Sequence, residues 1–125
     1  MTMGFEASGM CLDQGGEGFR AVISEGSGYL QRHPRTKLAA DIHLMMGDAY
    51  ADIVALADGG GYDLSESEKY VAEAPSARLK AIDEYRLSIR GTGLDTSSAS
   101  RAWTSAWSLL AGIAHRGTRF YCVYD

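Results

Sequence analysis

Three aspartates, Asp41, Asp48 and Asp52, are spaced so that they could share one face of a helix. Steps of seven and four residues place them within about 40° of one another around the helix axis. Carboxylates in a row repel one another unless water or cations screen them, so a basic peptide segment would be a natural ligand. The competing interpretation is the solvated outer face of an amphipathic helix. Lys37, one turn before Asp41, favours this interpretation because it partly neutralises the stripe.

The three histidines, His33, His43 and His115, share no motif. His43 precedes Asp48 by five residues, a spacing that does not bring two ligands to one helical face. No Ser-His-Asp order is persuasive, and the glycine run at 59–61 lacks the lysine and threonine of a phosphate loop. Neither cysteine stands at metal-ligand spacing from a histidine. We therefore expect no catalytic residue, no metal and no cofactor.

Cys11 and Cys122 lie near opposite ends of the chain. A disulfide between them would close a long loop and contribute on the order of 4–5 kcal/mol in the chain-entropy model. Two unrelated thiols are the alternative. A disulfide would favour a periplasmic or secreted protein. The first ten residues lack the basic start and hydrophobic core of a signal peptide, so a cytoplasmic location stays open.

Composition excludes several classes of protein. The chain has 125 residues, which fits one domain, and its 46% apolar and 22% charged residues are ordinary for a soluble globular protein. A net charge of −4 argues against nucleic acid as a partner, since neutralising phosphates needs clustered lysine and arginine. No apolar run approaches the roughly 18 residues of a transmembrane helix.

Apolar residues that recur at three and four positions predict an all-α fold of about four main helices, arranged as antiparallel hairpins. The pattern places these helices at residues 17–32, 36–58, 75–90 and 99–115, and Thr96-Ser97-Ser98 is expected to cap the last one. We expect residues 1–16 to be a flexible lead-in and 17–125 to form a single domain. That domain would include a linker at 59–74 and an extended aromatic tail at 117–125.

Gly47 stands in the middle of the second predicted helix, where glycine costs roughly 1 kcal/mol relative to alanine. This cost indicates a second helix packed very close to that point. Trp103 and Trp107 are four residues apart, and this spacing is more typical of a core stripe than of a ligand-stacking platform. The closing aromatic residues either dock on the helices or form an exposed partner anchor. They are Phe120, Tyr121 and Tyr124.

Two of the predicted helices resemble a tetratricopeptide (TPR) repeat. Helix A of that family carries a bulky apolar residue, a small residue and then an aromatic residue three positions later, as do Met46, Gly47 and Tyr50. Helix B reads Ala-Ile-x-x-Tyr-x-x-small-apolar, which the segment 81–89 reproduces. The exit at residues 29–36, Tyr-Leu-x-x-His-Pro-x-Thr, is most like the repeats of periplasmic outer-membrane assembly lipoproteins. Two departures are about 22 extra residues before helix B and a glycine, Gly93, where helix B would end in proline.

The resemblance implies a role for two sets of residues. The first set packs helix on helix: Met46, Gly47, Tyr50, Ala81, Tyr85 and Trp107. The second set would line a partner-binding groove: Asp41, Leu44, Asp48, Ala51 and Asp52. An unrelated, irregular four-helix bundle is the alternative fold.

The leading hypothesis is a non-enzymatic, TPR-like module that binds a protein or peptide partner, favours basic segments and works in a bacterial envelope assembly. One alternative is a small helical enzyme or ligand-binding bundle with a polar core pocket. The residues that would form such a pocket are Tyr50, Tyr85, His43 and Asp48. A third interpretation is a homo-oligomeric structural domain that associates through an exposed tryptophan face.

Overall fold

The computed structural model describes residues 17–57, 68, 70–91 and 93–112. These residues form four helices and no strand, so the all-α prediction is confirmed. The linker at 59–74 is described only in part, and residues 1–16, the tail at 117–125, Cys11 and Cys122 lie outside the described residues. The helices are α2 (Glu17–Arg32), α3 (Ala39–Ala57), α5 (Ala74–Arg90) and α6 (Thr96–Ala111).

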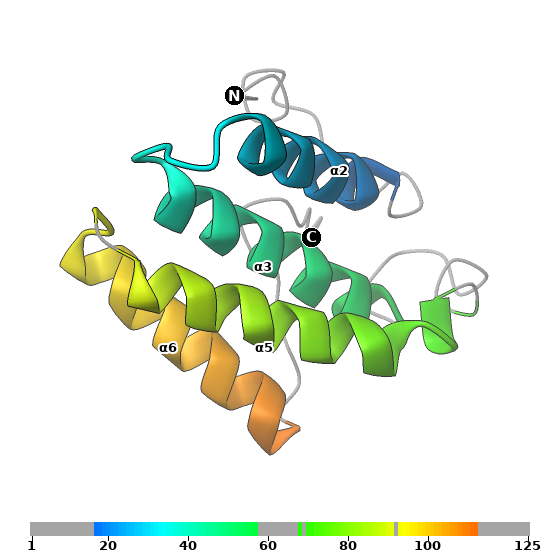
Figure 1. The fold of residues 1–125 in the computed structure, drawn as a ribbon. Helices are drawn as coiled ribbons and strands as arrows, with labels where there is room; N and C mark the ends of the chain where they lie inside the picture. Colours follow the sequence, from blue (N-terminus) through cyan, green and yellow to red (C-terminus); the bar gives the residue numbers. More distant parts are fainter. Residues whose placement is uncertain (1–16, 58–67, 69, 92, 113–125) are drawn as a thin grey trace, which may run out of the picture.

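The helices lie in a row, and each runs antiparallel to the one before it (Figure 1). Helix α3 packs between α2 and α5, and α6 packs against the far side of α5. Helix α6 is therefore the end of the row. This arrangement gives α3 two helical neighbours and α6 one extensive neighbour among the described residues.

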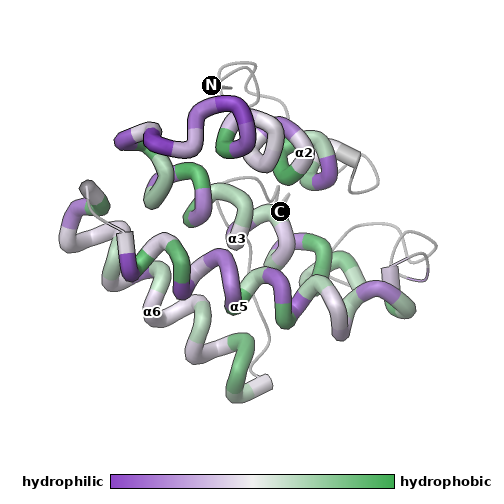
Figure 2. Tube along the Cα trace, in the orientation of Figure 1, coloured by the Kyte–Doolittle hydropathy of each residue, from purple (hydrophilic) through white to green (hydrophobic). Residues whose placement is uncertain are grey.

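Helix α3 forms most of the core. Between Leu44 and Leu56 every residue except Tyr50 is buried. Hydrophobic positions follow α3 along its length, whereas the connection from α2 to α3 is hydrophilic (Figure 2). The other helices each contribute a smaller buried set: Phe19 and Val22 from α2, Ala77, Ala81, Ile82 and Tyr85 from α5, and Ala102, Ala106 and Leu109 from α6.

Gly47 lies where α3 and α5 approach closely. A Cβ atom at this position would lie 2.9 Å from two ring carbons of Tyr85, which is fully buried. Gly26 of α2 plays the same part on the other side of α3, because a Cβ there would lie 2.8 Å from the sulfur of Met46. The glycines thus let both neighbours of α3 approach more closely than a larger residue allows.

Helix α6 begins and ends at positions that differ from the predicted ones. The carboxylate of Asp95 accepts a hydrogen bond from the backbone N–H of Ser98 at 2.7 Å, so Asp95 is the N-cap and the Thr-Ser-Ser segment forms the first turn. The helix ends at Gly112, whose φ of 73° is the left-handed conformation that terminates many helices. None of the described helices is both long enough and apolar enough to cross a lipid bilayer.

Candidate functional site

Helix α6 exposes its largest apolar side chains. Trp103 is 53% exposed, Trp107 61% and Leu110 54%, although tryptophan is on average a well-buried residue. The three stand at i, i+4 and i+7, so they form one continuous stripe along the helix. The expectation that Trp107 packs between helices and that both tryptophans belong to the core is therefore wrong.

A second, smaller face of α6 packs against the rest of the protein. Its buried residues, Ala102, Ala106 and Leu109, are mostly small, and small residues let α6 lie close to α5. Arg101 stands beside this face, and its Nη1 donates a hydrogen bond at 2.9 Å to the carboxylate of Asp48 on α3. Pairing with this buried carboxylate requires Arg101 to point inward, which turns the tryptophan stripe outward.

The Asp48 carboxylate connects three helices. Its Oδ1 accepts hydrogen bonds from the Arg101 guanidinium and from the hydroxyl of Tyr85 on α5, the latter at 2.8 Å. Burial, and then the charge of Asp48, raise the pKa of the Tyr85 hydroxyl well above its usual value. Burial lowers the pKa of Arg101, but the hydrogen bond and charge of Asp48 outweigh it and the net pKa is raised. Both groups therefore remain donors to Asp48 at neutral pH.

The C-terminal end of α6 has its own polar anchor. The guanidinium of Arg78 on α5 donates hydrogen bonds to the carbonyl oxygens of Leu109 at 2.6 Å and Leu110 at 3.3 Å. The last carbonyls of a helix have no partner within the helix, and a cation near them is favourable. Arg101 and Arg78 thus fix α6 at two levels along its length.

The predicted acidic groove on α3 is not a surface. Only Asp41 is exposed, whereas Asp48, Asp52, Leu44 and Ala51 are buried. The prediction of a solvent-facing stripe is wrong because α3 is enclosed by its neighbours and Asp48 is compensated by Arg101 and Tyr85. The four buried positions belong to the interior and cannot contact a partner in the folded chain.

The residues of the hypothetical polar core pocket divide into two groups. Tyr85 and Asp48 are bonded to each other, whereas Nδ1 of His43 lies 2.6 Å from Glu84 Oε1 and links α3 to α5 in a half-buried position. Tyr50 is half-buried beside this second pair, and its pKa is raised by burial and by the charge of Glu84. None of these four residues lines a cavity beside Trp103 or Trp107.

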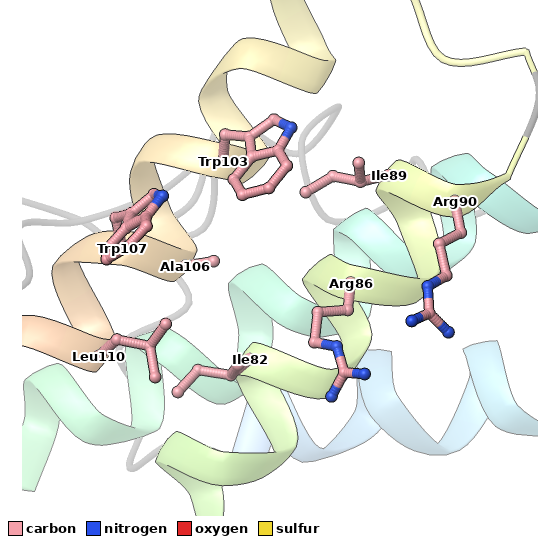
Figure 3. A pocket seen from close by; sticks show the side chains of 8 residues that line it. All are labelled: Ile82, Arg86, Ile89, Arg90, Trp103, Ala106, Trp107 and Leu110. Carbon is pink, nitrogen blue, oxygen red and sulfur yellow. The ribbon is translucent and has the colours of Figure 1, made fainter.

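A groove of about 300 Å³ lies between α5 and α6, next to the exposed tryptophans (Figure 3). On their other side, Trp103 and Trp107 border an open, shallow surface whose other described residues are Thr104, Ser108 and Ala111 of α6. The α5–α6 groove is lined by Ile82, Arg86, Ile89, Arg90, Trp103, Ala106, Trp107 and Leu110.

The α5 wall of this groove is apolar and carries two arginines at its outer edge. Arg86 and Arg90 line the groove mainly with their apolar stems, and their guanidinium groups point together away from Trp103 and Trp107 (Figure 3). No carboxylate is among the described residues that line the groove. Arg86 contacts Asp83 at 3.4 Å, but both side chains are mostly exposed, so this pair contributes little. Among the described residues Arg90 makes no ion pair.

The groove could not be recognised from the sequence, although the spacing of its apolar residues is visible there. Ile82, Arg86 and Ile89 recur at i, i+4 and i+7 on α5, as the tryptophan stripe does on α6. Two such stripes form a groove only when their helices pack side by side with both stripes facing out, which spacing alone does not reveal. Comparisons of the chain with protein-family models, curated proteins and solved structures found no match.

Proposed function

We propose that the chain is a non-enzymatic helical module that binds a protein or peptide partner through the α5–α6 groove. The observation that carries this proposal is the exposure of Trp103 and Trp107 side by side on the end helix of the row. Contiguous exposed apolar surface marks interaction sites in soluble proteins. Tryptophan and arginine are also the residue types most enriched among those that dominate binding energy.

Helix α6, which forms one wall of the groove, is held in place by side chains of other helices, and this favours a preformed binding surface. Helix α6 is anchored by Arg101 to Asp48 and by Arg78 to the carbonyls at its own C-terminal end. Binding surfaces on anchored helices lose less conformational entropy on association than mobile loops do. A partner would therefore meet the tryptophans already in position.

Membership of the TPR family and a place in a bacterial envelope assembly stay predictions, and the proposed binding surface does not depend on either. The oxidation state of the two cysteines provides a separate test of the envelope location. Thiol titration of the denatured, unreduced protein should find no free thiol if Cys11 and Cys122 form a disulfide, and two if they do not.

Site-directed photo-crosslinking in the native host tests the binding surface. A benzophenone side chain at Leu110 lies in the groove wall, whereas the same probe at Leu79 lies on α5 outside the groove lining and is as exposed. We expect the Leu110 probe to form an adduct with a different protein and the Leu79 probe to form none. The captured protein, once purified, should bind the wild-type chain and bind the Trp107→Ala variant at least about tenfold more weakly.

Two results would overturn the proposal. One is equal capture from Leu110 and Leu79, which would make the groove an ordinary surface. The other is an adduct formed only with a second copy of this chain, together with a mass in light scattering that rises with concentration. That outcome would identify a homo-oligomeric domain.

A further inference from the structure

We propose that the groove accepts one amphipathic helix of a different protein, with an apolar stripe facing the tryptophans and carboxylates one turn apart facing Arg86 and Arg90. This inference rests on the proposed function, because it names the partner of the same groove. It follows from the shape of the groove, from the arginines at its edge and from the absence of aspartate and glutamate in α6.

The shape of the groove suits a rod. Its α5 wall consists of residues at i, i+4, i+7 and i+8, and its α6 wall consists of residues at i, i+3, i+4 and i+7. Both walls therefore run along helix axes, with Ala106 and Ile82 as the buried residues of the lining (Figure 3). A small-molecule site would enclose most of its ligand. Here the tryptophans are more than half exposed, so the groove favours a ligand that lies along it.

The charge of the groove selects the polar edge of that ligand. Arg86 and Arg90 are four residues apart, so their Cα atoms are separated by about 6 Å along the axis of α5. Carboxylates at i and i+4 of a partner helix have the same spacing. Arginine also binds carboxylates in a planar, two-point geometry. An acidic edge of a partner helix is therefore attracted to the two arginines at the edge of the groove, although the net charge of the whole chain is −4.

A second copy of this chain does not supply that ligand through the same surface. Helix α6 contains no aspartate or glutamate, and its single charged residue, Arg101, is bonded to Asp48. Two-fold pairing of two α5–α6 surfaces would bring four arginines to one interface without a carboxylate from either groove lining. Charge complementarity therefore favours a different protein.

Fluorescence titration of the full chain provides the test, because both tryptophans of the protein lie in the groove. The probe is a synthetic helical peptide of about four turns with leucine at every third or fourth position and glutamates one turn apart. The control peptide has lysines in place of those glutamates. We expect the acidic peptide to change the tryptophan emission and to bind about tenfold more tightly than the basic one at low salt, with the difference shrinking as salt rises.

A charge exchange separates attraction from packing. The double variant Arg86→Glu/Arg90→Glu should reverse the preference, so that the basic peptide binds more tightly than the acidic one. The control double variant Arg32→Glu/Arg35→Glu changes the net charge by the same amount at exposed positions outside the groove, and it should keep the wild-type preference.

The possible failures are distinguishable. If both peptides bind with equal affinity, or if the basic one binds more tightly to the wild-type chain, the acidic-helix inference is overturned and the groove remains a binding surface. If Leu110 also gives no specific adduct, the proposed function fails as well. A mass that doubles with concentration, in parallel with the change in emission, would replace the foreign helix with a second copy.

Discussion

Replacing Arg101 with methionine tests whether the ion pair with Asp48 holds α6 in place. Methionine keeps the long apolar stem of arginine and removes the charge and the hydrogen bonds. The Asp48 carboxylate is fully buried and the Arg101 side chain is 40% exposed. The variant therefore leaves a buried charge with less compensation, while the lost group was itself partly in contact with water.

The expected cost follows from this difference in burial. Removing one partner of a fully buried ion pair typically costs about 3–5 kcal/mol. In this protein the hydroxyl of Tyr85 still donates to Asp48, and solvent reaches the Arg101 side chain. We therefore expect a loss of about 2 kcal/mol in the free energy of unfolding. This is a large share of the roughly 5–15 kcal/mol that stabilises an ordinary domain.

Urea unfolding followed by circular dichroism measures this loss. Tryptophan fluorescence is the weaker probe here, because both tryptophans are already more than half exposed in the folded state. A loss of about 2 kcal/mol corresponds to a drop of about 1 M in the urea midpoint for a slope near 2 kcal/mol per M. The double variant Asp48→Asn/Arg101→Met should lose less than the sum of the two single variants, because the two residues interact directly.

The matched control is Arg86→Met on α5. Arg86 also contacts an aspartate, but at 3.4 Å and with both side chains mostly exposed, so the change should cost less than about 0.5 kcal/mol. If Arg101→Met costs no more than this control, the ion pair does not hold α6. The bond from Arg101 to Asp48 would then not be the reason that the tryptophan stripe faces outward.

Two further predictions concern α3 and its neighbours. Gly47→Ala should lower the free energy of unfolding by about 1–3 kcal/mol, since the new Cβ would lie 2.9 Å from the buried ring of Tyr85, whereas Gly28→Ala meets only the end of the flexible Arg32 side chain and should be stabilising. Urea midpoints that move in the same direction for both glycines would contradict this. The raised pKa of Tyr85 means that the folded chain keeps a proton that the unfolded chain releases above about pH 10. The free energy of unfolding should therefore be unaffected by Tyr85 at lower pH and fall by about 1.4 kcal/mol per unit at higher pH. Urea unfolding between pH 8 and about 11 measures this fall. The free energy of unfolding of the Tyr85→Phe variant should decrease less with pH than that of the wild-type chain, and an equal decrease in both would contradict the role assigned to Tyr85.

The helices could be predicted because their apolar spacing and their glycine and proline boundaries are local properties. The burial of Asp48 and Asp52 had a local signal too. From Leu44 to Ala57 they are the only charged residues, and a helix that is apolar all round is usually enclosed on all sides. The spacing of the three aspartates predicted a polar face on α3, whereas the apolar composition of the other faces predicted that the helix is enclosed.

The orientation of α6 could not be predicted in this way. This helix has two apolar faces side by side, and hydrophobicity alone favours burying the tryptophans rather than Ala102 and Ala106. The decision depends on Arg101 meeting Asp48, a partner 53 residues away in the sequence. Such a contact exists only once the helices are packed, so the groove could not be recognised before the fold was known.

The row of helices also has a consequence for how the chain folds. Each helix packs mainly on the helix next to it in the chain, so most contacts are local along the sequence and the chain should fold quickly. Proteins built as rows can unravel from one end, because an end unit is held by a single neighbour. The bond from Arg101 to Asp48 reaches past α5 to α3 and ties the end of the row to its centre. It should therefore make α6 open together with the core, so that amide hydrogens of α6 exchange as slowly as those of α3 in the wild-type chain and much faster once the bond is removed.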